Sequence, residues 1–298
     1  MTQKDKICSI LQMPISWMNE LKYPSPNVIT DSETIEMISK NNMSLSRFGD
    51  GELCLMRGIG IKFQSPNKEL AHRLKVIANE EIDGHLVAIP YMVSHFKESK
   101  AFLTKKSYSF WKKTLLYSKG YYNKFFHRSV YGDTNLTRFY IERKDKDKRS
   151  QYIEELRKMF IDKQILFVEG KNTHLGVDND LFGEVCRLDS RCRRVICPSK
   201  DAFDKYDKIL SAVLSVAHKD ELIILALGPT ATVLSRDLAV AGYRALDLGH
   251  IDVEYMWWKQ RTDKPQAIKG KDMTEVASYV PKEKENEIYL SQIVAKIE

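Results

Sequence analysis

Short apolar runs alternate with stripes of helical spacing along most of the chain. The most apolar run covers residues 222–227 and has the length of a buried strand. A Gly-Pro-Thr turn follows it, then a helical pattern over 231–241 and a second apolar run over 243–248. Strands that alternate with helices in this way predict an α/β fold with a parallel sheet covered by helices.

The N-terminal half shows the same alternation. Thr30 and Glu33 have the spacing of a capping box, so we expect a helix to begin there. Ser65 and Pro66 resemble the start of another helix, over 67–80, with one apolar stripe behind it. The other predicted elements are strands at 43–48, 86–90 and 164–168, helices at 95–118 and 151–162, and a charged connector at 141–150.

The length of 298 residues suits one large α/β domain better than two independent ones. With 43% hydrophobic and 29% charged residues, the composition is that of a globular protein. We therefore expect a single domain over 1–298, with its core at 30–260. A basic helical insertion is expected at 95–150 and a polar, peripheral C-terminal tail at 265–298.

Neither export nor a membrane span is indicated. Lys4 and Lys6 are followed by a stretch too polar for the core of a signal peptide. The run at 222–227 is far shorter than the roughly 20 residues that a transmembrane helix needs. The five cysteines form an odd set without a C-x-x-C pair, so neither a disulfide framework nor a zinc ribbon is expected. A cytoplasmic location fits these features best.

Positive charge is concentrated in one stretch. Residues 97–149 hold fifteen Lys or Arg and five Asp or Glu, whereas the net charge of the whole chain is +7. Aromatic residues lie between these lysines, a mixture suited to an anionic membrane, a lipid phosphate or a nucleic acid. The alternative is structural, because aromatic residues at helical spacing usually form core and the lysines between them form a solvated face.

The loop after the strand at 43–48 is the first candidate site. Its sequence is Arg47-Phe48-Gly49-Asp50-Gly51-Glu52. In an open parallel sheet, ligands bind beyond the carboxyl ends of the strands. Two carboxylates on such a loop suit Mg²⁺ or Mn²⁺ with positions left for diphosphate oxygens, and the arginine would neutralise phosphate charge. Acidic residues beside glycine are also ordinary turn chemistry, so this pattern alone leaves both interpretations open.

The turn Gly228-Pro229-Thr230 is the second candidate. It joins an apolar strand to a helix, where backbone N–H groups and the helix dipole favour a phosphate. The alternative is a plain strand-to-helix turn capped by Thr230. Neither G-x-G-x-x-G after a strand nor G-x-x-x-x-G-K-[ST] occurs, which disfavours dinucleotide enzymes and P-loop nucleotidases.

The third candidate follows the last predicted strand. If residues 250–254 are extended, His250, Asp252 and Glu254 project from one face, because strand side chains alternate. Asp252 is then a candidate base for an acceptor hydroxyl, because a neighbouring carboxylate raises its proton affinity, and His250 a contact for phosphate or sugar. An edge strand with a solvated polar face would give the same pattern. The polar stretch 169–182 follows a buried strand and is a further candidate lining of this cleft.

Five separated motifs occur in one order along residues 46–255. They are Ser46-Arg47-Phe48-Gly49-Asp50-Gly51-Glu52, Val168-Glu169-Gly170, Asn179-Asp180-Leu181-Phe182, Leu227-Gly228-Pro229-Thr230-Ala231-Thr232-Val233-Leu234, and Gly242-Tyr243 with Asp247 through Tyr255. Together they resemble the GT-D-type family of bacterial glycosyltransferases. The resemblance implies a Rossmann-like, mostly parallel sheet flanked by helices, a UDP-sugar donor, Mn²⁺ or a similar cation, and a D-x-E metal motif at Asp50 and Glu52.

The same resemblance implies which residues meet the nucleotide sugar. The implied donor-binding residues are Arg47, Gly49, Glu169, Asn179, Asp180, Gly228, Pro229 and Thr230, and the candidate catalytic residues are Asp252, Glu254 and His250. Family members build surface glycans or glycosylate adhesins, so the implied acceptor is a glycan on lipid or protein. The basic stretch would then hold that acceptor at the inner membrane face, with no nucleic acid as partner.

Two other classes of function are alternatives. A nucleic-acid or anionic-surface binding module would explain the basic stretch, but it has no need of the acidic loop at Asp50 and Glu52. A nucleotide-dependent phosphotransferase or hydrolase would use the same metal loop and would release phosphate instead of transferring sugar. The set of five motifs favours the glycosyltransferase.

Overall fold

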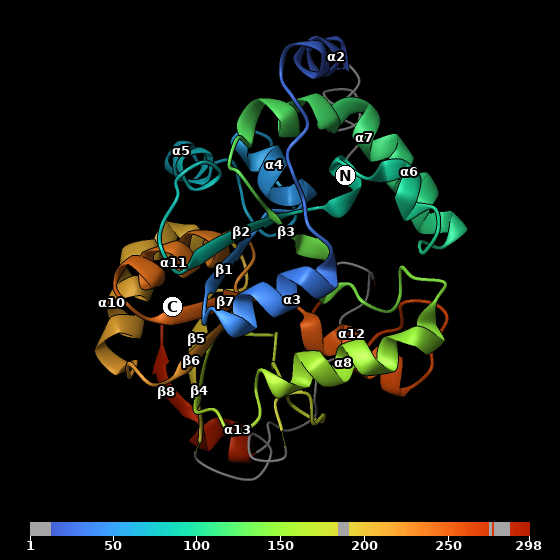
Figure 1. Ribbon diagram of the computed structural model, residues 1–298. Coiled ribbons are helices and arrows are strands. Elements are labelled where there is room, and N and C mark those ends of the chain that lie inside the picture. The colour runs from blue at the N-terminus through green and yellow to red at the C-terminus, as the bar shows by residue number, and fades with distance from the viewer. Residues whose placement is uncertain (1–12, 184–190, 274–275, 277–286) are drawn as a thin grey trace.

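The computed structural model describes residues 13–183, 191–273, 276 and 287–298 (Figure 1). Its described residues form one eight-stranded sheet of parallel strands in the order β3-β2-β1-β7-β6-β4-β5-β8. The predicted α/β class and parallel sheet are confirmed. The strands are β1 (Ser44–Arg47), β2 (His85–Ile89), β3 (Gly132–Asp133), β4 (Ile165–Gly170), β5 (Cys192–Cys197), β6 (Leu222–Ala226), β7 (Arg244–Asp247) and β8 (Ile293–Lys296).

Helices cover both faces of this sheet (Figure 1). On β4, Leu166 and Val168 pack into one hydrophobic cluster, whereas Ile165 and Phe167 pack into a second cluster on the opposite face. Strands buried on both faces carry nearly continuous apolar runs, as the sequence showed. The helices are α2 (Met13–Lys22), α3 (Asp31–Lys40), α4 (Asp50–Met56), α5 (Lys68–Ile77), α6 (Phe96–Ser99), α7 (Lys105–Phe125), α8 (Arg149–Lys158), α10 (Tyr206–Val216), α11 (Pro229–Val240), α12 (Ile251–Lys259) and α13 (Glu287–Ser291), with 3₁₀ turns at Tyr91–Val93, Thr134–Thr137, Lys146–Lys148 and Ala202–Lys205.

Local signals set the starts of two helices. At α3 the predicted capping box is present, because the N–H of Thr30 donates to Glu33 Oε2 at 2.8 Å and the N–H of Glu33 donates to Thr30 Oγ1 at 3.3 Å. At α5 the predicted cap is wrong by two residues. Asn67, and not Ser65, caps this helix, since its Oδ1 accepts the N–H of Leu70 at 3.0 Å.

The first part of the basic stretch forms α6 and α7, with residues 100–104 between them, in place of the single helix predicted over 95–118. Its later part includes β3, which belongs to the sheet. Trp111, Tyr122 and Phe126 are buried in the first cluster, whereas most lysines of α7 are exposed. The structural interpretation of these aromatic residues is confirmed. Buried rings do not stack on bases, so Trp111, Tyr122 and Phe126 form no aromatic platform for a nucleic acid.

The C-terminal residues extend the sheet. Strand β8 pairs with β5 at one edge, so the prediction of a tail peripheral to the fold over 265–298 is wrong for this strand. Part of that tail, 274–275 and 277–286, lies outside the described residues. Cys54 and Cys197 carry free thiols, but Cys192 is disulfide-bonded, a bond that the sequence analysis did not predict. None of the described helices has the length and apolar character needed to cross a membrane.

Candidate active site

The chain leaves the neighbouring strands β1 and β7 toward opposite faces of the sheet. After β1 it enters α4, whose Leu53 and Met56 pack in the first cluster. After β7 it enters α12, whose Ile251 and Val253 pack in the second cluster. Diverging connections of this kind open a crevice beyond the carboxyl ends of the strands, where ligands of open α/β sheets bind. We call this place the β1–β7 switch point.

Arg47 is fixed at the switch point by three hydrogen bonds. Its Nε donates to the backbone oxygen of Asp247 at 2.7 Å, its Nη2 to Asp247 Oδ1 at 3.1 Å and its Nη1 to Thr137 Oγ1 at 2.8 Å. Burial raises the pKa of Asp247, and the adjacent guanidinium opposes that shift. The result is a positioned, partly exposed cation at the carboxyl end of β1, suited to an anionic group of a ligand.

Gly249 makes room for this arginine. Its φ is +50°, and a Cβ built on it would lie 2.4 Å from Arg47 Nη2. A side chain at this position would therefore displace the guanidinium as well as strain the backbone. The glycine that follows β7 in the sequence motif thus has a physical role in placing Arg47.

Asp50 and Glu52 both lie in the first turn of α4. Asp50 is exposed, and Glu52 Oε2 accepts the N–H of Gly49 at 2.8 Å. Burial raises the pKa of Glu52 to about 7, and repulsion from Asp247 adds to this shift. The protein alone therefore leaves this carboxyl incompletely ionised near neutral pH, and a nearby cation would favour its charged form.

This pair fits a divalent cation only with help from a substrate. The described residues contain no group of three or more His, Cys, Asp or Glu side chains arranged to hold a metal. Mg²⁺ and Mn²⁺ at phosphate-transfer sites commonly use one or two carboxylates and fill their other positions with phosphate oxygens and water. Each acid of α4 could supply one carboxylate to such a set, but residues two apart in a helix point about 200° away from each other, so the helix does not by itself bring Asp50 and Glu52 to one cation.

The turn before α11 has space above it. Gly228 is the N-cap with φ +53°, and nothing lies within 4 Å of the position that a Cβ would take there. Thr230 is fully buried, and among the described residues its Oγ1 has no hydrogen-bond partner. The alternative in which Thr230 caps the helix is therefore wrong, because no side-chain cap bond exists at this end.

Residues 251–259 form helix α12, so the extended conformation considered for 250–254 is wrong. His250 is the N-cap residue and is partly exposed. In a helix, residues two apart point about 200° away from each other, so His250, Asp252 and Glu254 do not share one face.

Asp252 and Glu254 are buried with protein partners. Asp252 Oδ2 lies 2.5 Å from Lys271 Nζ and accepts the N–H of Gly176 at 2.9 Å. Glu254 Oε2 accepts the N–H groups of Tyr140 and Ile141 at 3.1 and 3.0 Å. Burial raises the pKa of Glu254 to about 7. These contacts give both carboxyl groups a role in holding α12 against neighbouring segments.

The stretch 169–182 packs against α12 as well. Glu169 is fully buried, with Oε1 2.6 Å from Arg194 Nη1 and Oε2 accepting the N–H of Leu175 at 2.6 Å. Asp180 lies 2.6 Å from Lys259 Nζ and accepts the Tyr255 hydroxyl at 3.1 Å. Asn179 Oδ1 accepts the N–H of Leu181 within its own turn. The protein contacts of these three residues stabilise the fold around α12, and their contact with a donor stays a prediction.

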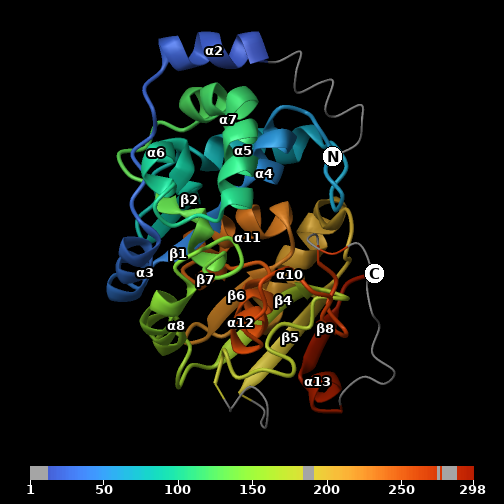
Figure 2. The same cartoon turned by 90° about the vertical axis from the view of Figure 1, so that its right-hand side faces the viewer.

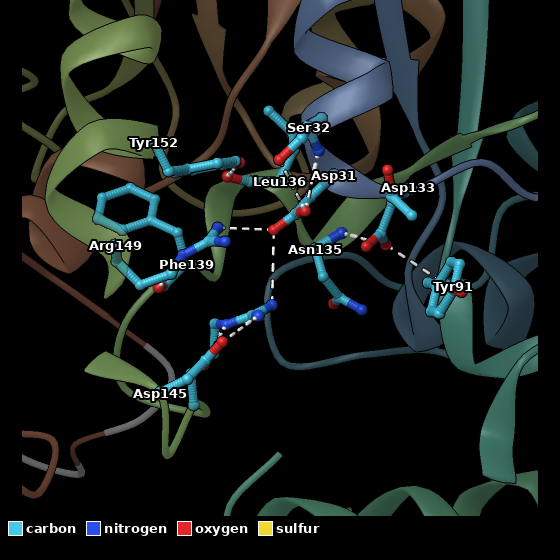
Figure 3. Close-up of polar contacts among 12 residues, drawn as sticks. Asp31, Ser32, Tyr91, Asp133, Asn135, Leu136, Phe139, Asp145, Arg149 and Tyr152 are labelled. Carbon is cyan, nitrogen blue, oxygen red and sulfur yellow. Dashed lines mark hydrogen bonds and ion pairs between the residues drawn. The ribbon is translucent and has the colours of Figure 1, made fainter. Parts of the chain in front are cut away.

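Some polar groups at the carboxyl edge of the sheet were not singled out in the sequence. Asp133, at the end of β3, accepts the N–H groups of Tyr91 and Asn135 at 3.1 and 2.8 Å (Figure 3). Beside it, Arg149 Nη2 lies 2.6 Å from Asp31 Oδ2 (Figure 3). Burial raises the pKa of Asp133 to about 8, and Asp31 adds to this shift. The sequence pattern that could have pointed to Asp133 was weak, because β3 has only two residues.

Asp133→Asn is expected to stabilise the protein at pH 7 relative to the wild type. The folded-state pKa lies above that of the unfolded chain, so Asp133 makes stability fall as pH rises from about 4 to 8, by up to about 1.4 kcal/mol per pH unit. Asparagine keeps an oxygen for both N–H donors and removes this dependence. Urea unfolding at several pH values checks it, with the exposed Asp83→Asn as control. A stability gain that does not grow with pH would contradict the assignment.

Comparisons with known proteins agree on one group. Residues 45–276 match the family model described as "Glycosyltransferase GT-D fold". The chain is 34% identical over 278 residues to "Probable glycosyl transferase Gly" of Streptococcus gordonii, covering 91% of this chain and 39% of that protein. It is 34% identical over 271 residues to "Glycosyltransferase GlyD" of Streptococcus pneumoniae serotype 4, covering 89% of this chain and 32% of that protein. The chain thus spans 39% and 32% of the lengths of these curated relatives.

Solved structures give the same result. One, described as "The highly conserved domain of unknown function 1792 has a distinct glycosyltransferase fold", has a TM-score of 0.84 and 33% identity, with 97% of this chain and 100% of that chain covered. Another, "A New Glycosyltransferase (DUF1792) from Streptococcus sanguinis", has a TM-score of 0.83 and 32% identity, with 92% of this chain and 100% of that chain covered. Sequence and fold similarity therefore extend over nearly the whole chain.

Proposed function

This chain belongs to the glycosyltransferase GT-D fold family, and we propose that it transfers a sugar from a UDP-sugar to a glycan acceptor with the help of Mn²⁺ or Mg²⁺. The acceptor is a growing bacterial surface glycan or a glycoprotein, on lipid or on protein. The observation that carries the proposal is the fixed position of Arg47 at the β1–β7 switch point, followed in the chain by Asp50 and Glu52 in the first turn of α4.

Donor binding follows from the charges at this place. Arg47 is held in position to neutralise part of the diphosphate charge, and the turn at Gly228 leaves room for an anionic group above the N-terminus of α11. Asp50 and Glu52 would hold the divalent cation, which supplies stabilisation of the negative charge that builds on the leaving diphosphate. The protein thus prepares for the charge that develops as the bond to the sugar breaks.

Proton removal from the acceptor requires a base near the same crevice. Asp252, the base predicted from the sequence, is fully buried beside Lys271. His250 is partly exposed and precedes α12 at the switch point. A base must come within hydrogen-bond reach of the hydroxyl that it deprotonates. We therefore assign this role to His250 in place of Asp252, whose contacts support a structural role.

UDP together with Mn²⁺ is expected to raise the melting temperature. A ligand at 100 times its dissociation constant stabilises the folded state by about 2.7 kcal/mol. Differential scanning fluorimetry measures the shift with UDP, GDP or ADP, each with Mn²⁺ or with EDTA. A shift that requires both UDP and Mn²⁺ supports the donor and cation together. No shift with any of these nucleotides would overturn the proposed donor class.

A further inference from the structure

Helix α2 turns its apolar side chains outward. Its buried residues are the polar Ser16 and Asn19. Its large apolar side chains are exposed, namely Ile15 at 48%, Trp17 at 54%, Met18 at 69% and Leu21 at 91%. A surface helix normally buries its apolar stripe against the core, so this orientation calls for a physical explanation.

Close polar packing on α7 fixes this orientation. The N–H of Gly120 donates to Ser16 Oγ at 3.0 Å, and Asn123 Nδ2 donates to the backbone oxygen of Tyr23 at 3.0 Å. A Cβ at position 120 would lie 1.8 Å from the backbone oxygen of Ser16, so only glycine permits this approach. Rotating α2 to bury its apolar residues would break these contacts.

The neighbouring surface of α7 is basic and partly apolar. Helix α7 contains six lysines and no acidic residue. Its Phe110 and Leu116 are 51% and 48% exposed, and the exposed Lys112 and Lys113 lie between them in the sequence. The acidic residue of α2, Glu20, lies 4.0 Å from Lys119. We use the name α2–α7 face for the exposed side chains Ile15, Trp17, Met18 and Leu21 of α2 together with Phe110, Lys112, Lys113 and Leu116 of α7, and Figure 2 shows both helices together at one end of the molecule.

We infer that the α2–α7 face docks on the surface of an anionic lipid bilayer. Trp17, Met18 and Leu21 would enter the boundary between headgroups and acyl chains, as apolar side chains of interfacial helices do. The lysines of α7 would lie near the anionic headgroups. The inference uses neither the proposed donor nor the cation, so it stands or falls separately from the proposed function.

Charge argues against a second copy of this chain as the occupant. A two-fold interface places the same patch on both sides, so it would gather the lysines of two α7 helices in one interface, with no acidic residue on either helix to pair with them. Like charges gathered in this way oppose association. An anionic bilayer instead complements the lysines and accepts the exposed apolar side chains, which explains both features of the face at once.

Vesicle sedimentation of the full chain tests the inference. We expect binding at low salt to phosphatidylcholine vesicles that contain phosphatidylglycerol and little binding to phosphatidylcholine alone. Lys112→Gln/Lys113→Gln should weaken binding about fivefold per lysine. Trp17→Ser/Leu21→Ser should weaken it by about tenfold or more, because apolar insertion is lost.

Matched variants elsewhere serve as controls. Lys205→Gln/Lys208→Gln removes two exposed lysines, and Ile161→Ser removes an apolar side chain that is 48% exposed; both should bind like the wild type. All substituted side chains are exposed, so each variant should keep the melting temperature of the wild type. This measurement verifies that the variants are folded. Absence of binding to anionic vesicles, equal binding to neutral ones, or equal losses in controls would overturn the inference. So would a wild-type dimer that Trp17→Ser/Leu21→Ser dissociates without any vesicle binding.

Discussion

Asp50→Asn is expected to lower kcat/KM for sugar transfer by about 10²-fold or more, because it removes one of the two carboxylates proposed to hold the cation. Asp50 is exposed in the first turn of α4. The melting temperature without ligands should therefore stay nearly unchanged. Transfer of radiolabelled sugar over a range of Mn²⁺ concentrations measures the effect.

Glu69→Gln is the matched control for this experiment. Glu69 is also an exposed acid in the first turn of a helix, α5, so its loss has the same effect on local charge and on the helix dipole. We expect wild-type transfer and a wild-type response to Mn²⁺ from this variant. If Asp50→Asn keeps that response as well, the cation lies elsewhere.

Asp252→Asn is expected to lower the free energy of unfolding by about 3–5 kcal/mol, because it leaves Lys271 charged and buried without its partner. The double variant Asp252→Asn/Lys271→Met should recover most of this loss, since it removes the unpaired buried charge while the amide oxygen at position 252 can still accept the N–H of Gly176. Urea unfolding measures both variants. Glu36→Gln, which breaks the exposed pair between Glu36 and Lys40, is the control and should cost little.

This experiment also separates the two roles considered for Asp252. If Asp252 is structural, Asp252→Asn should lower the free energy of unfolding while sugar transfer per folded molecule stays near that of the wild type. If Asp252 is the general base, the same variant should lower transfer by about 10²–10⁴-fold and leave the stability unchanged. The second pattern would restore Asp252 as the base and displace His250.

Features set by neighbours in the chain could be predicted from the sequence. The capping box of Thr30 and Glu33 depends on residues three apart, and the strand-turn-helix from β6 through Gly228 into α11 lies within twenty residues. The apolar runs of β2, β4 and β6 followed from burial on both faces, and β1 followed from the alternating polarity of residues 43–48. In these segments local propensity and burial favour the same conformation, which is why the pattern sufficed.

Features that depend on residues far apart in the sequence could not be predicted from it. Arg47 and Asp247 are 200 residues apart and meet only because β1 and β7 are adjacent in the sheet. Strand β8 is short, and its place is determined by pairing with β5. The alternation at 250–254 has the period of a strand, in which His250, Asp252 and Glu254 would share one face. In α12, Asp252 and Glu254 are buried together with Ile251 and Val253, so the alternation carried no information about exposure.

The two helices that flank the switch point are rooted in different hydrophobic clusters. Leu53 anchors α4 in the cluster on one side of the sheet, and Val253 anchors α12 in the cluster on the other. Substitutions that repack one layer therefore leave the other half of the crevice in place. Under the proposed function, a change in the layer beneath α4 is therefore expected to alter the cation side of the crevice while the side around His250 keeps its geometry, and the reverse holds for the layer beneath α12.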